Sequence, residues 1–88
     1  MLIPDYRGAF KKDLAKIQRR GKDITKLISI ICMLVGEAPL PAKYEDHALK
    51  GDYVGHRDCH IEPDWVLIYM VDKPYISFVR TGSHSDLF

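Results

Sequence analysis

Residues 53–81, YVGHRDCHIEPDWVLIYMVDKPYISFVRT, decide the fold of this 88-residue chain. Aromatic and β-branched residues dominate the stretch, and two short polar segments, residues 62–64 and 72–74, divide it into three apolar runs. Runs of this composition are typical of strands, and Pro and Asp between them are typical of turns. We therefore expect three consecutive antiparallel strands, at residues 53–61, 65–71 and 75–81.

The residues before this stretch follow a helical period instead. Asp5 suits an N-cap and Gly21 a C-terminal signal, so a first helix is expected between them. Its apolar positions are Tyr6, Phe10, Leu14 and Ile17. Asp23 and Gly36 bracket a second helix in the same way. Its apolar stripe comprises Ile24, Leu27, Ile28, Ile31, Leu34 and Val35. Residues 1–3, closed by Pro4, suit a short edge strand, and residues 37–50 read as a loop.

Together these elements predict an α+β fold, with two N-terminal helices packed on one face of a small, mainly antiparallel, twisted sheet. A chain of 88 residues with 47% hydrophobic residues is enough for one domain, which we expect to span residues 1–88. No apolar run could span a bilayer and no signal segment is present, so we expect no membrane association. Cys32 and Cys59 lack metal-type spacing, and we expect free, buried thiols in a reducing cytoplasm.

Charge is distributed unevenly along the chain although the formal net charge is only +1. Residues 1–26 hold eight basic and three acidic side chains, whereas residues 27–88 hold five basic and nine acidic ones. A basic helical front of this kind can meet phosphates or an acidic partner on one face. A solvated helix face explains the same charges, and charge alone favours that simpler reading.

Three of the four histidines lie close together in the sequence, in and before the first expected strand. Residues two apart on a strand share a face, so His56, Asp58 and His60 should project together onto the sheet face that the helices leave free. Histidine is the side chain best suited to transfer protons near neutral pH, which makes this row a candidate catalytic site. A solvated polar face is the competing interpretation. A metal site is a weaker one, because ligands that alternate along one flat strand diverge.

The same alternation leaves two arginines on the face expected to carry the core. Arg57 shares its face with Cys59 and Ile61, and Arg80 falls in step with Phe78. Either a bulge shifts the register of these strands or the arginine stems run along apolar neighbours to the sheet edge. The pattern leaves both explanations open.

Three segments together resemble one known family. They are residues 44–51 (YEDHALKG), 55–69 (GHRDCHIEPDWVLIY) and 80–88 (RTGSHSDLF). They resemble the YafQ toxins, which belong to the RelE superfamily of bacterial type II toxin–antitoxin systems. The resemblance covers nearly the whole chain and implies a RelE-like fold. It also implies an endoribonuclease that enters the ribosomal A site and cuts mRNA there, which inhibits translation.

The resemblance also implies a set of functional residues. The catalytic positions that it carries over are His47, Asp58, His60, Asp64 and His84. Phe88 matches a terminal aromatic residue of the family. His56 departs from the family, which more often has an aromatic residue there, and it is left out of the catalytic set.

Metal-free RNA cleavage needs a base for the 2′-OH proton, an acid for the leaving 5′-oxygen and a cation near the phosphorane. Two histidines can supply the base and the acid, while the carboxylates fix their tautomers and favour their protonated forms. Arg80 is the expected phosphate clamp, since a guanidinium binds phosphate oxygens in pairs. Phe88 or Trp65 could stack a base, although Trp65 suits the core equally well. Lys50 is a further expected RNA contact.

The implied partners are a ribosome with its mRNA and a DinJ-like antitoxin. We expect the antitoxin to contact the basic front at Lys11, Lys12, Lys16 and Arg19, to dimerise through a ribbon-helix-helix region and to bind operator DNA. Neither a cofactor nor a metal is expected. The alternative from another class is a non-catalytic RNA- or protein-binding member of the same fold, because fold alone does not decide function.

Overall fold

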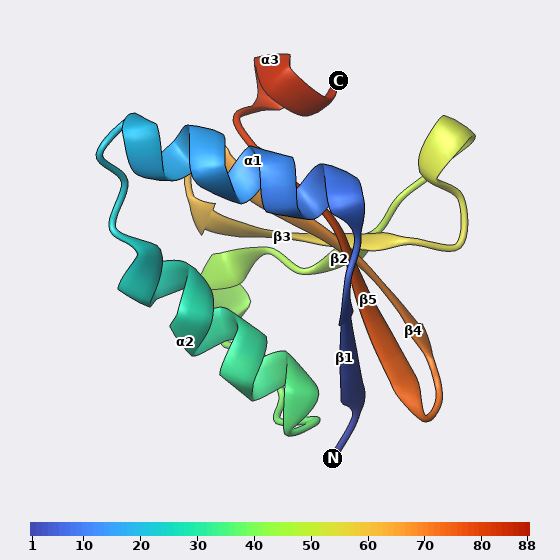
Figure 1. Cartoon of the computed structure of the whole chain (residues 1–88). Helices are drawn as coiled ribbons and strands as arrows, with labels where there is room; N and C mark the ends of the chain where they lie inside the picture. Colours follow the sequence, from blue (N-terminus) through green and yellow to red (C-terminus); the bar gives the residue numbers. More distant parts are fainter.

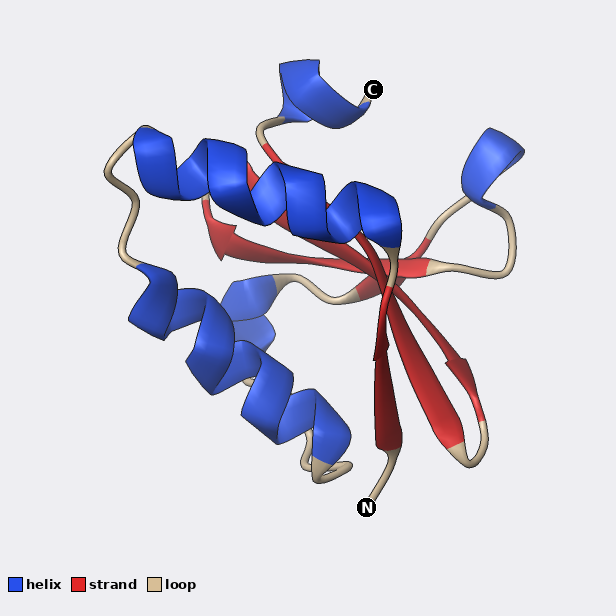
Figure 2. Ribbon diagram, viewed as in Figure 1, coloured by secondary structure: helices blue, strands red, loops and turns tan.

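Five strands form one mixed sheet in the order β1-β5-β4-β3-β2 in the computed structural model, which describes all residues 1–88 (Figure 2). The strands are β1 (Ile3–Tyr6), β2 (His47–Ala48), β3 (Arg57–Glu62), β4 (Trp65–Asp72) and β5 (Tyr75–Gly82). The helices are α1 (Gly8–Arg19), α2 (Ile24–Val35) and α3 (His84–Leu87), with 3-10 turns at Ala42–Tyr44 and Gly51–Tyr53. The predicted α+β fold is confirmed, with α1 and α2 covering one face of the sheet (Figure 1). None of the helices is both long enough and apolar enough to cross a bilayer.

The centre of the sheet follows the apolar runs of the sequence. β4 lies between β3 and β5 and is antiparallel to both, and its residues 65–69 are buried. Two strand predictions, residues 65–71 and 75–81, are confirmed to within one residue. A central strand is buried on both faces, and this explains why its sequence is continuously apolar.

The edges of the sheet differ from the prediction. β1 runs through Pro4 and Asp5 and pairs in parallel with β5, so the expected end of this strand at Pro4 and the expected N-cap at Asp5 are both wrong. Proline is tolerated there because β1 is an edge strand. Arg7 precedes α1 without a side-chain cap, whereas α2 is capped as predicted by Asp23, which accepts a 3.0 Å hydrogen bond from the Thr25 N–H.

The segment before β3 also differs. The strand expected from residue 53 begins only at Arg57, because Gly55 has φ +84° and interrupts the extended backbone. Part of the expected loop at residues 37–50 forms β2, which pairs His47 with Asp58. This short pairing places a loop histidine beside the central strands.

The larger core lies between the sheet and the two long helices. It is a cluster of 13 buried residues that includes Phe10, Trp65 and Phe78. α2 buries Leu27, Ile30 and Leu34, while Ile28 from the predicted stripe is 52% exposed. Ile30 was absent from that stripe because α2 has more apolar residues than one helix face can bury. Of the two free cysteines, Cys59 is buried as expected, but Cys32 is exposed.

Both explanations left open for the arginines occur. A bulge in β5 makes Phe78 pair with Tyr69 and Arg80 with Ile68, so Val79 is the extra residue and Arg80 leaves the core face. Arg57 pairs with Tyr69 and does keep the parity of the core face. Its guanidinium reaches Asp46 at 3.2 Å, at the exposed margin of the sheet.

Candidate active site

The sheet face opposite α1 and α2 carries the histidines. Pairing of β2 with β3 and of β3 with β4 puts His47, Asp58 and His60 on this face, in register with Ile68 and Val66. α3 then adds His84 from the end of β5. The ring centroids of His47 and His60 are 6.4 Å apart, and those of His60 and His84 are 5.3 Å apart. Three imidazoles that are distant in sequence therefore form one cluster.

The expected open face is partly covered. Val66 and Ile68 are fully buried in a small second cluster together with Leu87 of α3. Leu49, Tyr53 and Val79 pack at the margin of this cluster. The apolar patch gives α3 a fixed seat next to the histidines, which an entirely solvated face would not provide.

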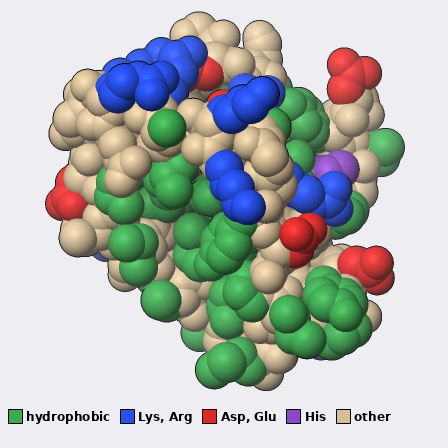
Figure 3. Space-filling view, in the orientation of Figure 1, with side chains coloured by type: hydrophobic (Ala, Val, Ile, Leu, Met, Phe, Trp, Pro, Cys, Tyr) green, Lys and Arg blue, Asp and Glu red, His purple; other side chains and the backbone are tan.

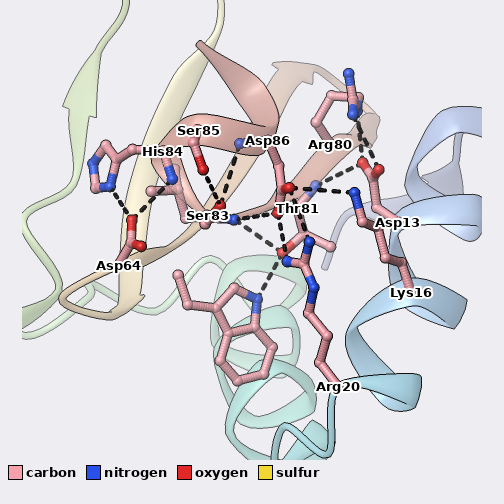
Figure 4. Close-up of polar contacts among 12 residues, drawn as sticks. Asp13, Lys16, Arg20, Asp64, Arg80, Thr81, Ser83, His84, Ser85 and Asp86 are labelled. Atoms are coloured by element: carbon pink, nitrogen blue, oxygen red, sulfur yellow. Dashed lines mark hydrogen bonds and ion pairs between the residues drawn. The ribbon is translucent and has the colours of Figure 1, made fainter.

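A capping box starts α3 and orients His84. The Ser83 Oγ accepts a hydrogen bond from the Asp86 N–H at 3.2 Å, and the Asp86 carboxylate accepts one from the Ser83 N–H at 2.9 Å. Asp64, in the turn between β3 and β4, accepts from both the backbone N–H and the Nδ1 of His84, at 2.9 and 2.7 Å (Figure 4). These hydrogen bonds hold the pKa of Asp64 below its usual value, the backbone bond contributing most.

Asp86 also ties α3 to α1. Its carboxylate accepts two hydrogen bonds from Arg20, at 2.7 and 3.1 Å, and one from Lys16 at 3.3 Å (Figure 4). The guanidinium of Arg20 is the main reason that the pKa of Asp86 lies far below its usual range. A Cβ at Gly82 would come within 2.9 Å of the Asp86 carboxylate, so this tight approach needs glycine. The sequence did not predict the contact between Asp86 and Arg20, because the two residues lie 66 positions apart.

Glu45 contacts two of the three histidines. Its backbone carbonyl accepts a hydrogen bond from His47 Nδ1 at 2.8 Å, and its carboxylate lies 2.8 Å from His60 Nδ1. The Nδ1 of His84 faces Asp64. His47 and His84 each direct a hydrogen bond from Nδ1 to an oxygen, so we infer that Nδ1 carries the proton of these two neutral rings and that Nε2 is left free. At His60 the Glu45 carboxylate lies beside Nδ1 as an ion pair, and its charge favours a proton on the same nitrogen.

Asp58 lies beneath the cluster and is only 3% exposed. Burial raises the pKa of its carboxyl, and the three nearby histidines counteract part of this rise. His47 Nδ1 lies 3.0 Å from Asp58 Oδ1 but directs its hydrogen bond to Glu45, which leaves this buried oxygen without a donor. An unpaired buried carboxylate oxygen is costly and favours positive charge close by.

Aromatic rings extend the cluster at the C-terminus. Phe88 is 61% exposed, and its ring lies 6.2 Å from that of His84 and 5.9 Å from that of Tyr53. Tyr53 in turn contacts His56, at 5.8 Å between ring centroids. His56 thus lies at the far end of the row, outside the group formed by the other three histidines.

The remaining expected RNA contacts lie in different settings. Trp65 is 1% exposed and donates its indole N–H to Thr81 at 3.0 Å, so it is a core residue and has no free face for a base. Arg80 is engaged by Asp13 through two hydrogen bonds, at 2.6 and 3.0 Å (Figure 4). Lys50 is exposed and forms no ion pair.

The basic front of α1 is only partly paired. Lys16 contacts Asp86, whereas Lys11, Lys12 and Arg19 are exposed and take part in no ion pair. Hydrophobic side chains are exposed below the basic side chains of α1 (Figure 3). An apolar groove of about 550 Å³ lies there between α1 and α2, lined by residues such as Phe10, Leu14 and Ile28.

No three His, Cys, Asp or Glu side chains are arranged to hold one metal ion. The geometry instead offers three imidazoles with free Nε2 atoms, one buried carboxylate and an exposed aromatic ring. Such a set can take up and return protons at a bound phosphodiester. Glu45, Tyr53 and Asp86 belong to its surroundings but were missed by sequence reasoning, because no spacing rule relates them to the histidines.

Comparisons with known proteins find similar toxins in sequence and in structure. The chain is 45% identical over 85 residues to the mRNA interferase toxin YafQ of Escherichia coli K12, covering 96% of this chain and 92% of that protein. Its structure matches the toxin in the E. coli DinJ–YafQ complex with a TM-score of 0.93 and 43% identity, covering 100% of this chain and 99% of that one. It also matches a metal-bound toxin from Helicobacter pylori with a TM-score of 0.94 and 40% identity, covering 100% of both chains.

The family model described as "Bacterial toxin of type II toxin-antitoxin system, YafQ" matches residues 3–88. This match spans every strand and helix described above, including the complete histidine cluster. The sequence resemblance to YafQ toxins is therefore confirmed, and the chain belongs to the YafQ family of type II toxins.

Proposed function

We propose that this chain is an mRNA interferase, an endoribonuclease that cuts messages in the ribosomal A site and so stops translation in the cytoplasm. Its family membership and its similarity to the E. coli mRNA interferase toxin support the activity. The observation that carries the chemistry is the cluster of three imidazoles, each with its Nδ1 against an oxygen and its Nε2 free.

The proposed reaction is a transesterification at phosphorus. One imidazole Nε2 removes the proton of the 2′-OH, and the 2′-oxygen forms a bond to phosphorus. The bond from phosphorus to the 5′-oxygen breaks, and a protonated imidazole gives its proton to this leaving oxygen. The products are a 2′,3′-cyclic phosphate and a 5′-hydroxyl end, and atoms and charge balance without a cofactor.

The carboxylates have separate roles in this proposal. Asp64 holds the His84 ring through Nδ1 and fixes its tautomer. Asp58 lies buried under the rings, where its unpaired oxygen stabilises the positive charge that an imidazole gains during the reaction. His60 lies between His47 and His84, so it can act with either neighbour as the acid–base pair.

RNA binding would rely on exposed groups around the cluster. Phe88 presents its ring beside His84 and suits stacking on a splayed base, and Lys50 is free to meet a phosphate. Arg80 can serve as a phosphate clamp only where its contact with Asp13 opens, because Asp13 occupies the paired donors that phosphate would use.

The cleavage experiment uses a message held on stalled ribosomes, with either ribose or 2′-deoxyribose at the scissile position. We expect cutting of the ribose message to leave a 2′,3′-cyclic or 3′-phosphate and a 5′-hydroxyl, and we expect no cutting of the deoxy message. Equal cutting of both would contradict the mechanism, since another nucleophile would then attack. A chelator that removes transition metals but leaves Mg²⁺ in place should not change the rate, and loss of activity with it would favour a metal-dependent reaction.

A DinJ-like antitoxin is the proposed partner, as in the E. coli DinJ–YafQ complex. The free basic residues Lys11, Lys12 and Arg19, together with Lys16 and the adjacent apolar groove, suit an acidic amphipathic segment. We propose that the antitoxin dimerises through a ribbon-helix-helix region, carries two toxins and binds operator DNA. Light scattering of the co-expressed complex after size-exclusion chromatography should give this stoichiometry. A monomeric toxin that leaves the co-encoded antitoxin unbound would contradict it.

A further inference from the structure

Glu45 uses all three of its polar groups, although no sequence pattern marked it as functional. Its backbone N–H donates to the Ala42 carbonyl at 3.0 Å and closes the 3-10 turn at Ala42–Tyr44. Its own carbonyl accepts from His47 Nδ1 at 2.8 Å. Its carboxylate lies 2.8 Å from His60 Nδ1. One loop residue therefore contacts two rings of the cluster from two different parts of itself.

The backbone conformation of Glu45 makes this double contact possible. Glu45 has φ 50° and ψ 46°, in the left-handed region that residues other than glycine, asparagine and aspartate seldom occupy. This conformation turns the carbonyl toward His47, two residues further along the chain, while the side chain extends across to β3. A strained residue of this kind is kept only where its surroundings determine it, and such residues concentrate at functional sites.

Glu45 lies at the boundary between the cluster and a groove of about 710 Å³. His60 lines the same groove, together with residues of α2 such as Lys26. The carboxylate of Glu45 is 66% exposed, whereas the His60 side chain is only 19% exposed. The carboxylate thus reaches inward from solvent and lies beside Nδ1 of the His60 ring.

We propose that Glu45 is a positioning residue for the reaction, holding His47 through its backbone carbonyl and His60 through its side chain, so that both rings present Nε2 to the substrate. The expected effect of Glu45 on the cleavage rate rests on the proposed function. Its contacts with the His47 and His60 rings do not, because they are present in the free protein. In this role Glu45 acts through the two rings and not directly on the reacting atoms.

Glu45 contacts His47 through its backbone and His60 through its side chain, so substitution of Glu45 should affect the two rings differently. In Glu45→Ala the carbonyl remains, so His47 should keep its proton on Nδ1. His60 loses the carboxylate beside its Nδ1 and should turn to the Nε2–H form that free imidazole prefers. Glu45→Gln keeps an oxygen at this place but not the charge, and it should restore only part of the Nδ1–H form of His60.

Ring ¹⁵N chemical shifts of the full chain, recorded above the titration range of histidine, report which nitrogen is protonated. We expect His60 alone to change in Glu45→Ala and to revert in part in Glu45→Gln. Glu45→Gly is the matched control for backbone strain, because glycine adopts φ 50° freely, and it should reproduce the alanine spectrum. An unchanged His60 in both Glu45→Ala and Glu45→Gly would overturn the inference, as would an equal change at His47.

Single-turnover cleavage of a ribosome-bound message gives the second measurement. We expect Glu45→Ala to lower the maximal cleavage rate constant by about tenfold, the size of roughly one charge-assisted contact. The half-saturating toxin concentration should stay nearly unchanged, and Glu45→Gln should restore part of the rate. A rise in the half-saturating concentration without a fall in the maximal rate constant would show a substrate-binding role and overturn positioning. If instead His60→Ala itself cleaves normally, the proposed function fails while the spectra still test the hold on the rings.

Discussion

The two faces of the sheet differ in what they carry. The face under α1 and α2 buries 13 core residues, and its one buried indole N–H is paired with Thr81. The opposite face buries a patch of three apolar residues and gathers three histidines, with one buried carboxylate oxygen that lacks a donor. Residues that alternate along β3 and β4 serve the two faces in turn. The larger core therefore lies on one face and the candidate catalytic groups lie on the other, although neighbouring residues of one strand belong to different faces.

The largest effect should come from breaking the helix-covered face. Trp65→Ala removes the largest fully buried side chain and its hydrogen bond to Thr81. We expect a loss of about 3–5 kcal/mol in the free energy of unfolding, much of the stability of a domain this small. Urea denaturation measures it. Wild-type stability in this variant, with weaker RNA binding instead, would support base stacking by Trp65 and contradict its place in the core.

Substitution on the opposite face should separate activity from stability. His84→Ala removes an exposed ring from α3, so the melting temperature should remain within a few degrees of the wild type. Cleavage of a ribosome-bound message should fall by about 10²–10⁴-fold, the usual contribution of one proton transfer. His56→Ala is the matched control, since this ring lies at the far end of the row. A strong loss of cleavage with His56→Ala and no loss with His84→Ala would mean that the catalytic residues are assigned wrongly.

Asp86 connects the two faces, and its removal should affect both. Asp86→Asn weakens the contacts with Arg20 and Lys16 that seat α3 on α1. We expect a loss of about 2 kcal/mol in the free energy of unfolding at pH 7, with reduced cleavage because His84 is less well placed.

The pH dependence gives the control for this variant. The folded-state pKa of Asp86 is depressed, so its stabilisation is present above the unfolded value of about 3.9 and is lost as the pH falls through the folded value. The difference between wild type and Asp86→Asn should therefore shrink below about pH 4. A difference that persists unchanged at acidic pH would show that packing, and not charge, links α3 to α1.

The smallest effect should have the opposite sign. Burial raises the pKa of Asp58, so its ionised form destabilises the folded state at pH values above the folded pKa. Asp58→Asn should raise the free energy of unfolding by about 1 kcal/mol at pH 8 and still reduce cleavage. The gain should vanish at acidic pH, where Asp58 is protonated. A destabilised Asp58→Asn at pH 8 that cleaves at the wild-type rate would show that the carboxylate serves the fold and not the reaction.

How far the sequence predicted these faces depends on the kind of signal. β4, β5 and both long helices could be predicted from composition and from the spacing of apolar residues. Burial on one or two faces of an element determines which of its positions are apolar. The parity of Arg80 indicated that a bulge was one of two possibilities, but the sequence did not place it at Val79. It did not predict the break at Gly55 either, because a local backbone conformation leaves no mark on the period of apolar residues. The wrong start of α1 has the same origin, since β1 competes for Asp5 through pairing with β5.

The residues of the candidate site also fall into those that the sequence predicted and those that it did not. The family motifs pointed to all three clustered histidines, and α3 and β2 do bring them together. Glu45 and Asp86 escaped prediction because each acts through tertiary contacts, Glu45 from a turn of unusual backbone conformation and Asp86 across 66 residues. Trp65 showed the limit of motif reasoning, since its place in a functional motif did not make it part of the functional surface.

The central claim is that the imidazoles on the sheet face opposite α1 and α2 act as acid and base. A message with sulfur in place of the 5′-bridging oxygen at the scissile position tests this claim most directly. A thiolate leaves without protonation, so this substrate needs the base but not the acid. Among His47→Ala, His60→Ala and His84→Ala, we predict that one variant which fails on the ordinary message recovers near wild-type cleavage of the sulfur-containing message, while another remains inactive. Equal defects of all three variants on both messages would contradict acid–base catalysis by this cluster.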